Sequence, residues 1–184
     1  MSRGIIIFGA PGSGQTTIGK ALAQDINAQH LDLDDYHWRW DTAIPYTVFR
    51  SAEERTQHLL ADVSKHPYFV MSGNMWSIRK SFEHLFDLAA FVAVPAEVRA
   101  ERIRNRELKR WGSRILPGGD MYEANAIYSQ DYLERVNEYE NDQAQQHKQW
   151  IKELPCPVVY IDGMAPIKES VATIRAAMAV DSDT

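Results

Sequence analysis

The fold of this 184-residue chain is decided by residues 9–17, which read Gly9-Ala10-Pro11-Gly12-Ser13-Gly14-Gln15-Thr16-Thr17 and directly follow the apolar run Gly4-Ile5-Ile6-Ile7-Phe8. The spacing is that of the phosphate-binding P-loop, G-x-x-x-x-G-K-[ST], except that Gln15 stands at the lysine position. Glycines let such a loop curl until successive backbone N–H groups point at phosphate oxygens. The helix expected after the loop adds the positive end of its dipole. We expect all nine residues to contact the phosphates of a nucleotide.

Two hydroxyl side chains close the motif. Thr16 is at the position whose expected role is to ligate a Mg²⁺ ion between the β- and γ-phosphates of ATP. Thr17 is placed to reach the α-phosphate. The alternative for both residues is simple capping of the helix N-terminus. The loop that precedes them favours the first interpretation, so ATP and Mg²⁺ are the expected cofactors.

Composition and charge limit the class of protein. Hydrophobic residues make up 45% and charged residues 24% of the chain, as in an ordinary globular domain. A net charge of −5 argues against nucleic acid or an acidic membrane surface as the main partner. The single cysteine, Cys156, excludes an internal disulfide, and no apolar run approaches the roughly 18 residues of a membrane span. We expect a cytoplasmic protein with one domain over residues 1–180 and a frayed tail at 181–184.

Hydrophobic patterns alternate between two types along the chain. Short apolar runs predict strands at 4–8, 29–33, 68–71, 89–94 and 157–161. Longer periodic stretches predict helices at 17–26, 51–65, 78–86 and 97–111, one long helix or a broken pair within 121–153, and a final helix after Gly163 with Pro166 in its first turn. Strands alternating with helices predict an α/β fold with a parallel sheet. Ligands of such sheets bind at the carboxyl ends of the strands.

Two carboxylates follow the second predicted strand. Asp32 and Asp34 are two residues apart, so they point to the same face if the strand continues that far. We expect Asp32 to hold the metal ion through water, and Asp34 to act as the general base that accepts a proton from the acceptor hydroxyl. Asp35 would point elsewhere and cap the local turn. The alternative is that these residues only mark a turn.

An arginine stripe runs along the predicted helix 97–111. Arg99, Arg102, Arg106 and Arg110 follow one another at steps of three, four and four and share one helix face. The first three have no acidic residue three or four positions away, which is unusual for a solvated face. We therefore expect Arg102 and Arg106 to bind the polyphosphate, and Arg106 and Arg110 to stabilise the transferring group.

The segment from about 106 to 122 has the features of a lid. Glycines lie near both ends of its loop, Gly112-Ser-Arg114-Ile-Leu-Pro-Gly-Gly119, with Arg114 between them. Closure of a lid excludes water, so that a phosphoryl group passes to the acceptor and is not hydrolysed. We expect Arg114 to join the arginines that bind ATP. The alternative is an ordinary surface loop.

The P-loop, the Asp-x-Asp and the arginine-rich helix with its lid together resemble the P-loop small-molecule and nucleoside monophosphate kinases. Shikimate and gluconate kinases are the more similar, because they share the Asp-x-Asp. The resemblance implies a three-layer fold around a five-stranded parallel sheet of order 2-3-1-4-5, and ATP-dependent phosphorylation of a hydroxyl or phosphate group. It also implies that the stretch from Asp162 to Pro166 holds adenine. After the third strand the chain departs from the shikimate kinase pattern of glycine and arginine.

Gln15 is the clearest departure from that group. A glutamine amide still donates hydrogen bonds, but it carries no charge to neutralise the transferring phosphoryl group. Loss of one such stabilising group commonly costs about 10²–10³ in rate. Two interpretations remain: a working kinase impaired at this position, or a protein that binds nucleotide without efficient catalysis. We favour the impaired kinase and count Gln15 among the catalytic positions.

The acceptor is less well defined by the sequence. Aromatic side chains at 36, 38, 40 and 76 offer stacking surfaces for a planar ring, and the arginines at 55 and 79 offer clamps for an acidic group. The expected acceptor-binding residues are Asp34, Trp38, Arg55, Gly73, Asn74 and Arg79. The alternative is that the aromatic residues close the core under a long loop.

A different class of function fits the same motif. A nucleotide-binding regulatory protein would bind ATP, close its lid and change a contact with a partner, with little catalysis. A motor-type ATPase is disfavoured, because strand 68–71 lacks the acidic pair that such enzymes use to activate water.

Overall fold

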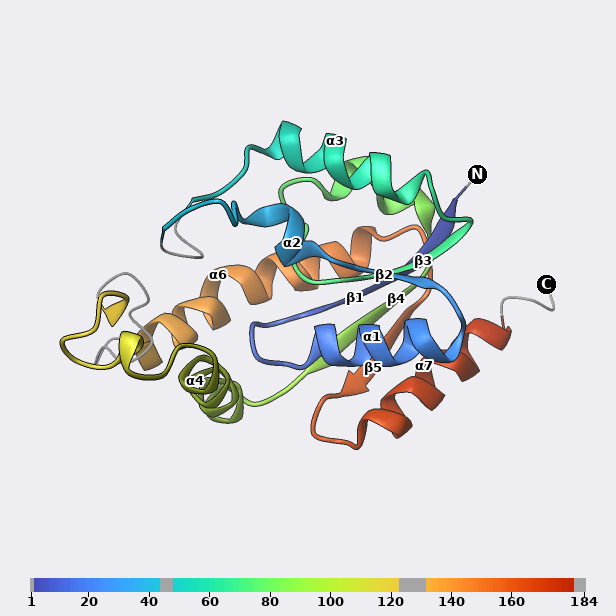
Figure 1. The fold of residues 1–184 in the computed structure, drawn as a ribbon. Helices are drawn as coiled ribbons and strands as arrows, with labels where there is room; N and C mark the ends of the chain where they lie inside the picture. The colour runs from blue at the N-terminus through green and yellow to red at the C-terminus, as the bar shows by residue number, and fades with distance from the viewer. Residues whose placement is uncertain (1, 44–47, 123–131, 181–184) are drawn as a thin grey trace.

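The computed structural model describes residues 2–43, 48–122 and 132–180. Within them, five parallel strands form one sheet in the order β2-β3-β1-β4-β5 (Figure 1). The strands are β1 (Arg3–Gly9), β2 (Gln29–Asp32), β3 (Tyr68–Ser72), β4 (Phe86–Ala93) and β5 (Val158–Asp162). The helices are α1 (Gln15–Asp25), α2 (Leu33–His37), α3 (Ala52–Val63), α4 (Ala96–Trp111), α6 (Tyr132–Glu153) and α7 (Ile167–Val180), with 3₁₀ turns η1 (Arg79–Ser81), η2 (Glu83–Leu85) and η3 (Gly112–Ile115). The predicted strand order is confirmed.

Helices cover both faces of the sheet. Because successive side chains of a strand point to opposite faces, β1 contributes to two separate cores. Ile5 and Ile7 pack with residues of α1 and α7, whereas Ile6 and Phe8 pack with residues of α3 and α6 (Figure 1). All four side chains are fully buried. The three-layer α/β prediction is thus confirmed, and the carboxyl ends of β1, β2 and β3 meet at one edge.

The second strand is one residue shorter than predicted. β2 ends at Asp32, whose side chain accepts a hydrogen bond from the Asp34 backbone N–H at 3.2 Å and caps the short helix α2. The condition under which Asp32 and Asp34 would point to the same face, a strand that continues through Asp34, is therefore not met. An N-terminal aspartate can satisfy backbone donors that a strand would otherwise have to pair, which favours the turn into a helix here.

The prediction of a helix over residues 78–86 is also wrong. Ile78, Phe82 and Leu85 have helical spacing and are buried, but the chain follows the two 3₁₀ turns η1 and η2. β4 already begins at Phe86, which pairs with Gly4 of β1. Because β4 begins at Phe86, a helix cannot extend to this residue. The 3₁₀ turns η1 and η2 bury the apolar side chains that the helix was expected to bury.

The remaining helices agree with those predicted from the sequence. α4 covers the arginine-rich stretch, and Ser51 and Glu54 form the expected capping box at the start of α3. Pro166 lies immediately before α7, and its carbonyl accepts the first helical bonds. The described part of the stretch predicted as one helix or two is α6, while residues 123–131 and the predicted tail at 181–184 lie outside the described residues.

Candidate functional site

The loop between β1 and α1 has the backbone shape of a phosphate cradle. Gly12 and Gly14 adopt left-handed conformations, with φ of 82° and 97°, which side-chain-bearing residues rarely adopt. A Cβ atom at Gly9 would lie 2.5 Å from the Val92 carbonyl oxygen, and one at Gly12 would lie 2.7 Å from the Arg99 carbonyl oxygen. The loop can therefore pass this close to β4 and α4 only with glycine at both positions.

The first turn of α1 leaves its backbone donors available. Gly14 is the N-cap residue and, having no side chain, provides no side-chain cap to the helix start. Uncapped N–H groups at the N-terminus of an eleven-residue helix favour an anion through hydrogen bonds and through the helix dipole. The residues present thus fit a nucleotide phosphate, although Gln15 contributes no charge.

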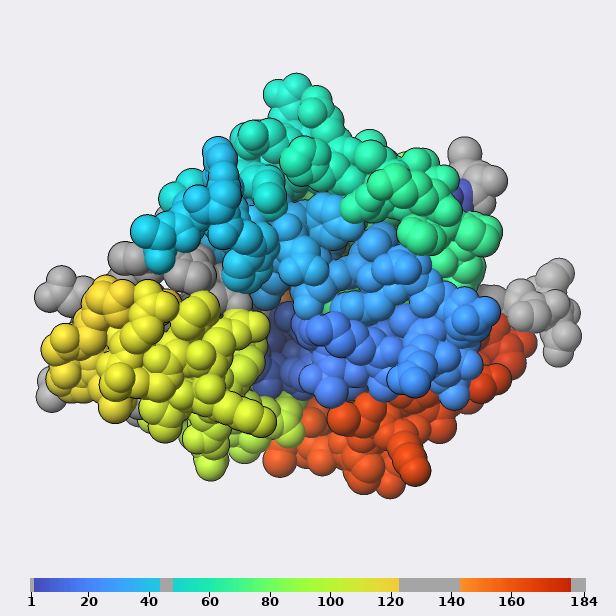
Figure 2. Space-filling model, viewed as in Figure 1, coloured from blue at the N-terminus to red at the C-terminus, as the bar shows by residue number. Residues whose placement is uncertain are grey.

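A cavity of about 280 Å³ opens over this loop. It lies between α1 and α4, where the surface in Figure 2 is recessed beside the blue N-terminal segment. From the loop and the start of α1 it is lined by Gly9, Pro11, Gly12, Gly14, Gln15, Thr16 and Thr17. From elsewhere in the chain it is lined by Asp34, Asn74, Arg102, Ile103, Arg106 and Gln143. Five segments distant in sequence therefore meet around one space.

Asp34 faces this cavity from α2. Asp34 is an exposed residue, but the protein atoms close to its carboxyl partly desolvate it and raise its pKa from 3.8 to about 6, with Asp32 contributing in the same direction. Arg106 and Arg110 act in the opposite direction. A carboxyl with a pKa near neutrality can both accept and release a proton under physiological conditions, as general base catalysis requires.

Asp32 does not line the same cavity. It faces a separate surface depression together with Asp35 and His30, and one of its oxygens caps α2. Because β2 ends at Asp32, the expected alternation that would have aimed Asp32 and Asp34 together is absent. The role of Asp32 in holding a metal ion stays a prediction.

The arginines of the stripe along α4 have different environments. Arg99 is 1% exposed, and its guanidinium donates to the carbonyls of Val94 at 3.1 Å and Pro11 at 3.4 Å, so it supports the loop from behind. Arg102 donates to the Gly163 carbonyl at 3.1 Å and lies 3.5 Å from the Ser13 carbonyl. Arg102 thus ties the P-loop to the segment that follows β5, where the resemblance places adenine.

Arg106 is held by the acidic residue that follows it in sequence. Its Nε donates to the buried Glu107 carboxylate at 2.7 Å, and Trp111 donates to the other oxygen of Glu107 at 2.9 Å. Arg106 has no acidic residue three or four positions away, but it pairs with the adjacent residue, which that spacing does not include. Within the described part of the chain, the two terminal nitrogens of Arg106 make no hydrogen bond, and the side chain lines the cavity.

The predicted lid is folded against the protein. Ile115 and Met121 are buried at 1% and 0% exposure, which anchors η3 and the turn after it. Arg114 forms an ion pair with Asp120 at 2.8 Å and does not line the cavity. Its expected contact with ATP stays a prediction that would require Arg114 to leave Asp120.

The expected acceptor residues are only partly brought together. Asn74 lines the cavity, where its amide lies 3.5 Å from Gln143, and its side-chain oxygen accepts from the Trp76 backbone at 2.9 Å. Gly73, with a φ of 126°, turns the chain out of β3 directly before it. Gln143 was missed, because a single glutamine within a long polar helix carries no pattern.

Three other predicted acceptor residues lie outside the cavity. Arg55 is buried, with one terminal nitrogen 2.7 Å from His37 Nδ1 and the other donating to Ser77 at 2.9 Å. Arg79 lies over the Trp76 ring at 3.6 Å and pairs with Glu83 and Glu153.

Trp38 stacks on Phe49, with the ring centroids 4.2 Å apart. This contact belongs to the loop that follows α2. In this structure Arg55, Arg79 and Trp38 all join segments of the fold to one another.

A relative places the chain in a family. The chain is 32% identical over 176 residues to the "Uncharacterized protein YqaC" of Bacillus subtilis (strain 168), and the match covers 93% of this chain and 94% of that protein. The chain belongs to the YqaC family. No protein-family model matches the sequence.

Solved structures show the fold to which this family belongs. A shikimate kinase from Acinetobacter baumannii in complex with shikimate matches with a TM-score of 0.61 at 12% identity, covering 98% of this chain and 95% of the kinase. A gluconokinase from Sinorhizobium meliloti 1021 matches with a TM-score of 0.56 at 16% identity, over 98% and 94%. A deoxyadenosine kinase from M. mycoides gives 0.52 at 12%, over 96% and 99%. The fold is that of the P-loop kinases.

Within residues 2–43, 48–122 and 132–180, no helix is long and apolar enough to cross a membrane.

Proposed function

We propose that this chain is an ATP-dependent phosphotransferase that acts on a hydroxyl or phosphate group of a small molecule. One observation carries the proposal: the P-loop cradle and the carboxyl of Asp34, with its pKa near 6, line the same cavity. A phosphate site alone would serve any nucleotide-binding protein. A base at its edge is what transfer to an acceptor hydroxyl requires.

The residues that line the cavity have different roles in the proposed reaction. The backbone N–H groups of the loop and of the first turn of α1 bind phosphate oxygens, and Thr16 and Thr17 add hydroxyl donors. Asp34 accepts the proton of the acceptor hydroxyl, and Asn74 orients the acceptor. Mg²⁺, bound with the nucleotide through the Thr16 hydroxyl, would supply charge neutralisation between the phosphates.

Gln15 leaves this site without the positive charge that a P-loop lysine would supply. Of the two arginines among the described residues that line the cavity, Arg102 is engaged by the carbonyls of Ser13 and Gly163, while the terminal nitrogens of Arg106 make no hydrogen bond with the described residues. We infer that Arg106, held in place by Glu107, supplies part of the positive charge that a P-loop lysine would provide. Activity is expected to be lower than in a protein with lysine at position 15.

The decisive experiment is an acceptor screen that measures ADP release and the phosphorylated product in parallel. It is run on the parent protein, on Gln15→Lys and on Asp34→Asn, with a panel that includes ring compounds, sugars and nucleosides. We expect an acceptor that gives product with Gln15→Lys, less with the parent and none above background with Asp34→Asn. Product formed equally by all three proteins would overturn the assignment of Asp34.

The neutral side chain of Gln15 also supports a second candidate. A nucleotide-binding regulatory protein needs the phosphate cradle but not the lysine charge. Tight ATP binding, together with no product from any acceptor even with Gln15→Lys, would favour that function.

A further inference from the structure

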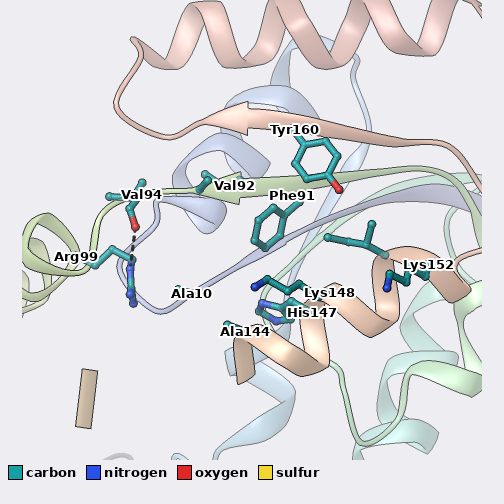
Figure 3. A pocket seen from close by; sticks show the side chains of 12 residues that line it. Ala10, Phe91, Val92, Val94, Arg99, Ala144, His147, Lys148, Lys152 and Tyr160 are labelled. Carbon is teal, nitrogen blue, oxygen red and sulfur yellow. Dashed lines mark hydrogen bonds between the residues drawn. The ribbon is translucent and has the colours of Figure 1, made fainter. Parts of the chain in front are cut away.

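A second, larger cavity lies between the edge of the sheet and α6. Its volume is about 550 Å³, and it adjoins the P-loop at Ala10, whereas the first cavity adjoins it at Gly9 and Pro11. Figure 3 shows Phe91 of β4 and Tyr160 of β5 projecting from the strands toward the side chains of α6. Small-molecule sites typically have volumes of about 300–1,000 Å³, so the cavity has the size of a binding site.

The walls of this cavity are mainly apolar. Phe91 and Val92 come from β4, and Ala144 and Ile151 come from α6 on the opposite side. Tyr160 is 63% exposed, on the last strand of the sheet, so one face of its ring is available for stacking. Aromatic and aliphatic walls of this kind favour a planar or branched apolar group.

The charged residues around the cavity are all cations. Lys148 and Lys152 lie one turn apart on α6, Arg99 lies at the end next to the P-loop, and no carboxylate belongs to the described residues that line the space. Within the described residues neither lysine makes an ion pair or a hydrogen bond. The neighbouring acid, Glu153, instead binds Lys80 at 3.2 Å and Gln149 at 2.7 Å.

His147 adds no charge to this set. Burial lowers its pKa to about 4, so the ring is neutral at pH 7. It packs edge-on against Phe8 and Phe91, with ring centroids 5.3 and 5.8 Å away. Lys148 and Lys152 are therefore the cationic side chains that α6 contributes among the described residues lining the cavity.

We propose that this cavity is a second ligand site, which binds an organic anion with an aromatic or branched apolar body. The body packs between Phe91, Tyr160 and Ile151, and the anionic group pairs with Lys148 and Lys152. The ligand class is a monoanionic or dianionic carboxylate, sulfonate or phosphate ester. This site is separate from the P-loop cavity and does not depend on phosphotransfer.

An occupant of this site would contact the back of the P-loop. Ala10 belongs to the loop, and Arg99 donates to the Val94 carbonyl at 3.1 Å (Figure 3). Arg99 also donates to the carbonyl of Pro11, in the loop itself, at 3.4 Å. A ligand that shifts either residue changes the loop that binds nucleotide. Because linkage is reciprocal, nucleotide would then change the affinity for the organic anion by the same factor.

The test uses 8-anilino-1-naphthalenesulfonate, an aromatic sulfonate, titrated into the full-length protein and followed by fluorescence and calorimetry. We expect saturable binding of one molecule, weakened about tenfold or more by Lys148→Glu and by Lys152→Glu, because each change replaces an attraction with a repulsion. Ala144→Trp, which fills the space, should have a similar effect. Lys168→Glu makes the same charge change on α7, away from the cavity, and should leave binding unchanged.

Three results would overturn the proposal. These are no saturable binding by the parent protein, binding by both lysine variants within twofold of the parent, and displacement of the probe by ATP in simple competition, which would place it in the P-loop cavity. Circular dichroism checks that each variant is folded. If Lys148→Glu or Lys152→Glu is not folded, the alanine variant at the same position, Lys148→Ala or Lys152→Ala, is used in its place.

Discussion

Asp34 is the residue on which the proposed chemistry depends most directly. Its pKa of about 6 arises mainly from desolvation by the surrounding protein, opposed by Arg106 and Arg110. A base of this kind is protonated, and so inactive, below pH 6. We expect kcat/KM to rise with pH through about 6 and to level off above it, and Asp34→Asn to remove both the activity and this dependence. An unchanged pH profile in a partly active Asp34→Asn variant would show that another group titrates.

The same pKa makes a prediction about stability. The folded-state pKa lies above the ordinary value of 3.8, so folding favours the protonated carboxyl. Stability associated with Asp34 is therefore present below pH 4 and is lost as the pH rises through 6. Urea unfolding should show Asp34→Asn gaining about 1 kcal/mol on the parent between pH 4 and 7, a small value because water in the cavity screens the charge. Asp41→Asn, at an exposed site, serves as the control; an equal gain there would contradict the assignment.

Gln15 and Arg106 are expected to act as a pair. If Arg106 supplies part of the missing charge, Gln15→Lys raises phosphotransfer about tenfold in the parent and by a larger factor in an Arg106→Gln background. A double-mutant cycle on kcat measures this coupling. Gln15→Met, which adds no charge, is the matched control and should not increase the rate.

Two results of the cycle would count against this pairing. Effects of the two substitutions that simply multiply would show that the side chains act independently. An unchanged rate in Gln15→Lys, measured with an accepted substrate, would show that charge at position 15 is not limiting.

At the scale of the element, the P-loop depends on the conformation of single glycines. Gly12 and Gly118 both have positive φ, 82° and 89°, but a Cβ atom at Gly12 meets the Arg99 backbone while one at Gly118 meets nothing within 4 Å. Gly118→Ala should therefore cost only the backbone strain, about 1 kcal/mol. Gly12→Ala should cost more, because loop and α4 must separate, and it should also abolish nucleotide binding. Chemical unfolding and nucleotide titration of both variants measure the difference; equal losses would contradict the packing argument.

Sequence patterns predicted most helices and strands. They did not predict that β2 gives way to a helix after Asp32, or that 79–85 forms 3₁₀ turns before β4. Apolar runs defined β1, β3 and β5 to within one residue at each end, whereas β4 begins three residues before its predicted start at 89. At Asp32 the outcome depended on whether a side chain capped the next turn, which periodicity does not record. Between 78 and 86 the helical spacing was real, but pairing of Phe86 with Gly4 decided the structure. Such long-range pairing cannot be read from a local window.

In the whole molecule, the parallel topology of the sheet explains why residues distant in sequence come together at the candidate site. The rule that parallel strands place ligands at their carboxyl ends anticipated that the P-loop, Asp34 and Asn74 would meet, and all three line one cavity. The rule gave no information on Arg55 and Arg79. Their partners, Ser77 and Glu153, lie 22 and 74 residues away in sequence. Arginine composition alone cannot distinguish such structural contacts from ligand contacts.

Binding of ATP to the P-loop should stabilise the entire fold, because the loop joins β1 at the centre of the sheet to α1. A ligand that binds only the folded state, present at about 100 times its Kd, adds about 2.7 kcal/mol. In a chain of this size each kcal/mol raises the unfolding midpoint by about 2–4 °C. We therefore expect ATP with Mg²⁺ to raise the midpoint by about 5–10 °C in thermal unfolding, AMP to raise it less, and Gly12→Ala to show no shift with either. Because this measurement needs no acceptor, a missing shift at millimolar ATP would refute nucleotide binding itself, whereas a shift without phosphotransfer would leave the regulatory function as the better explanation.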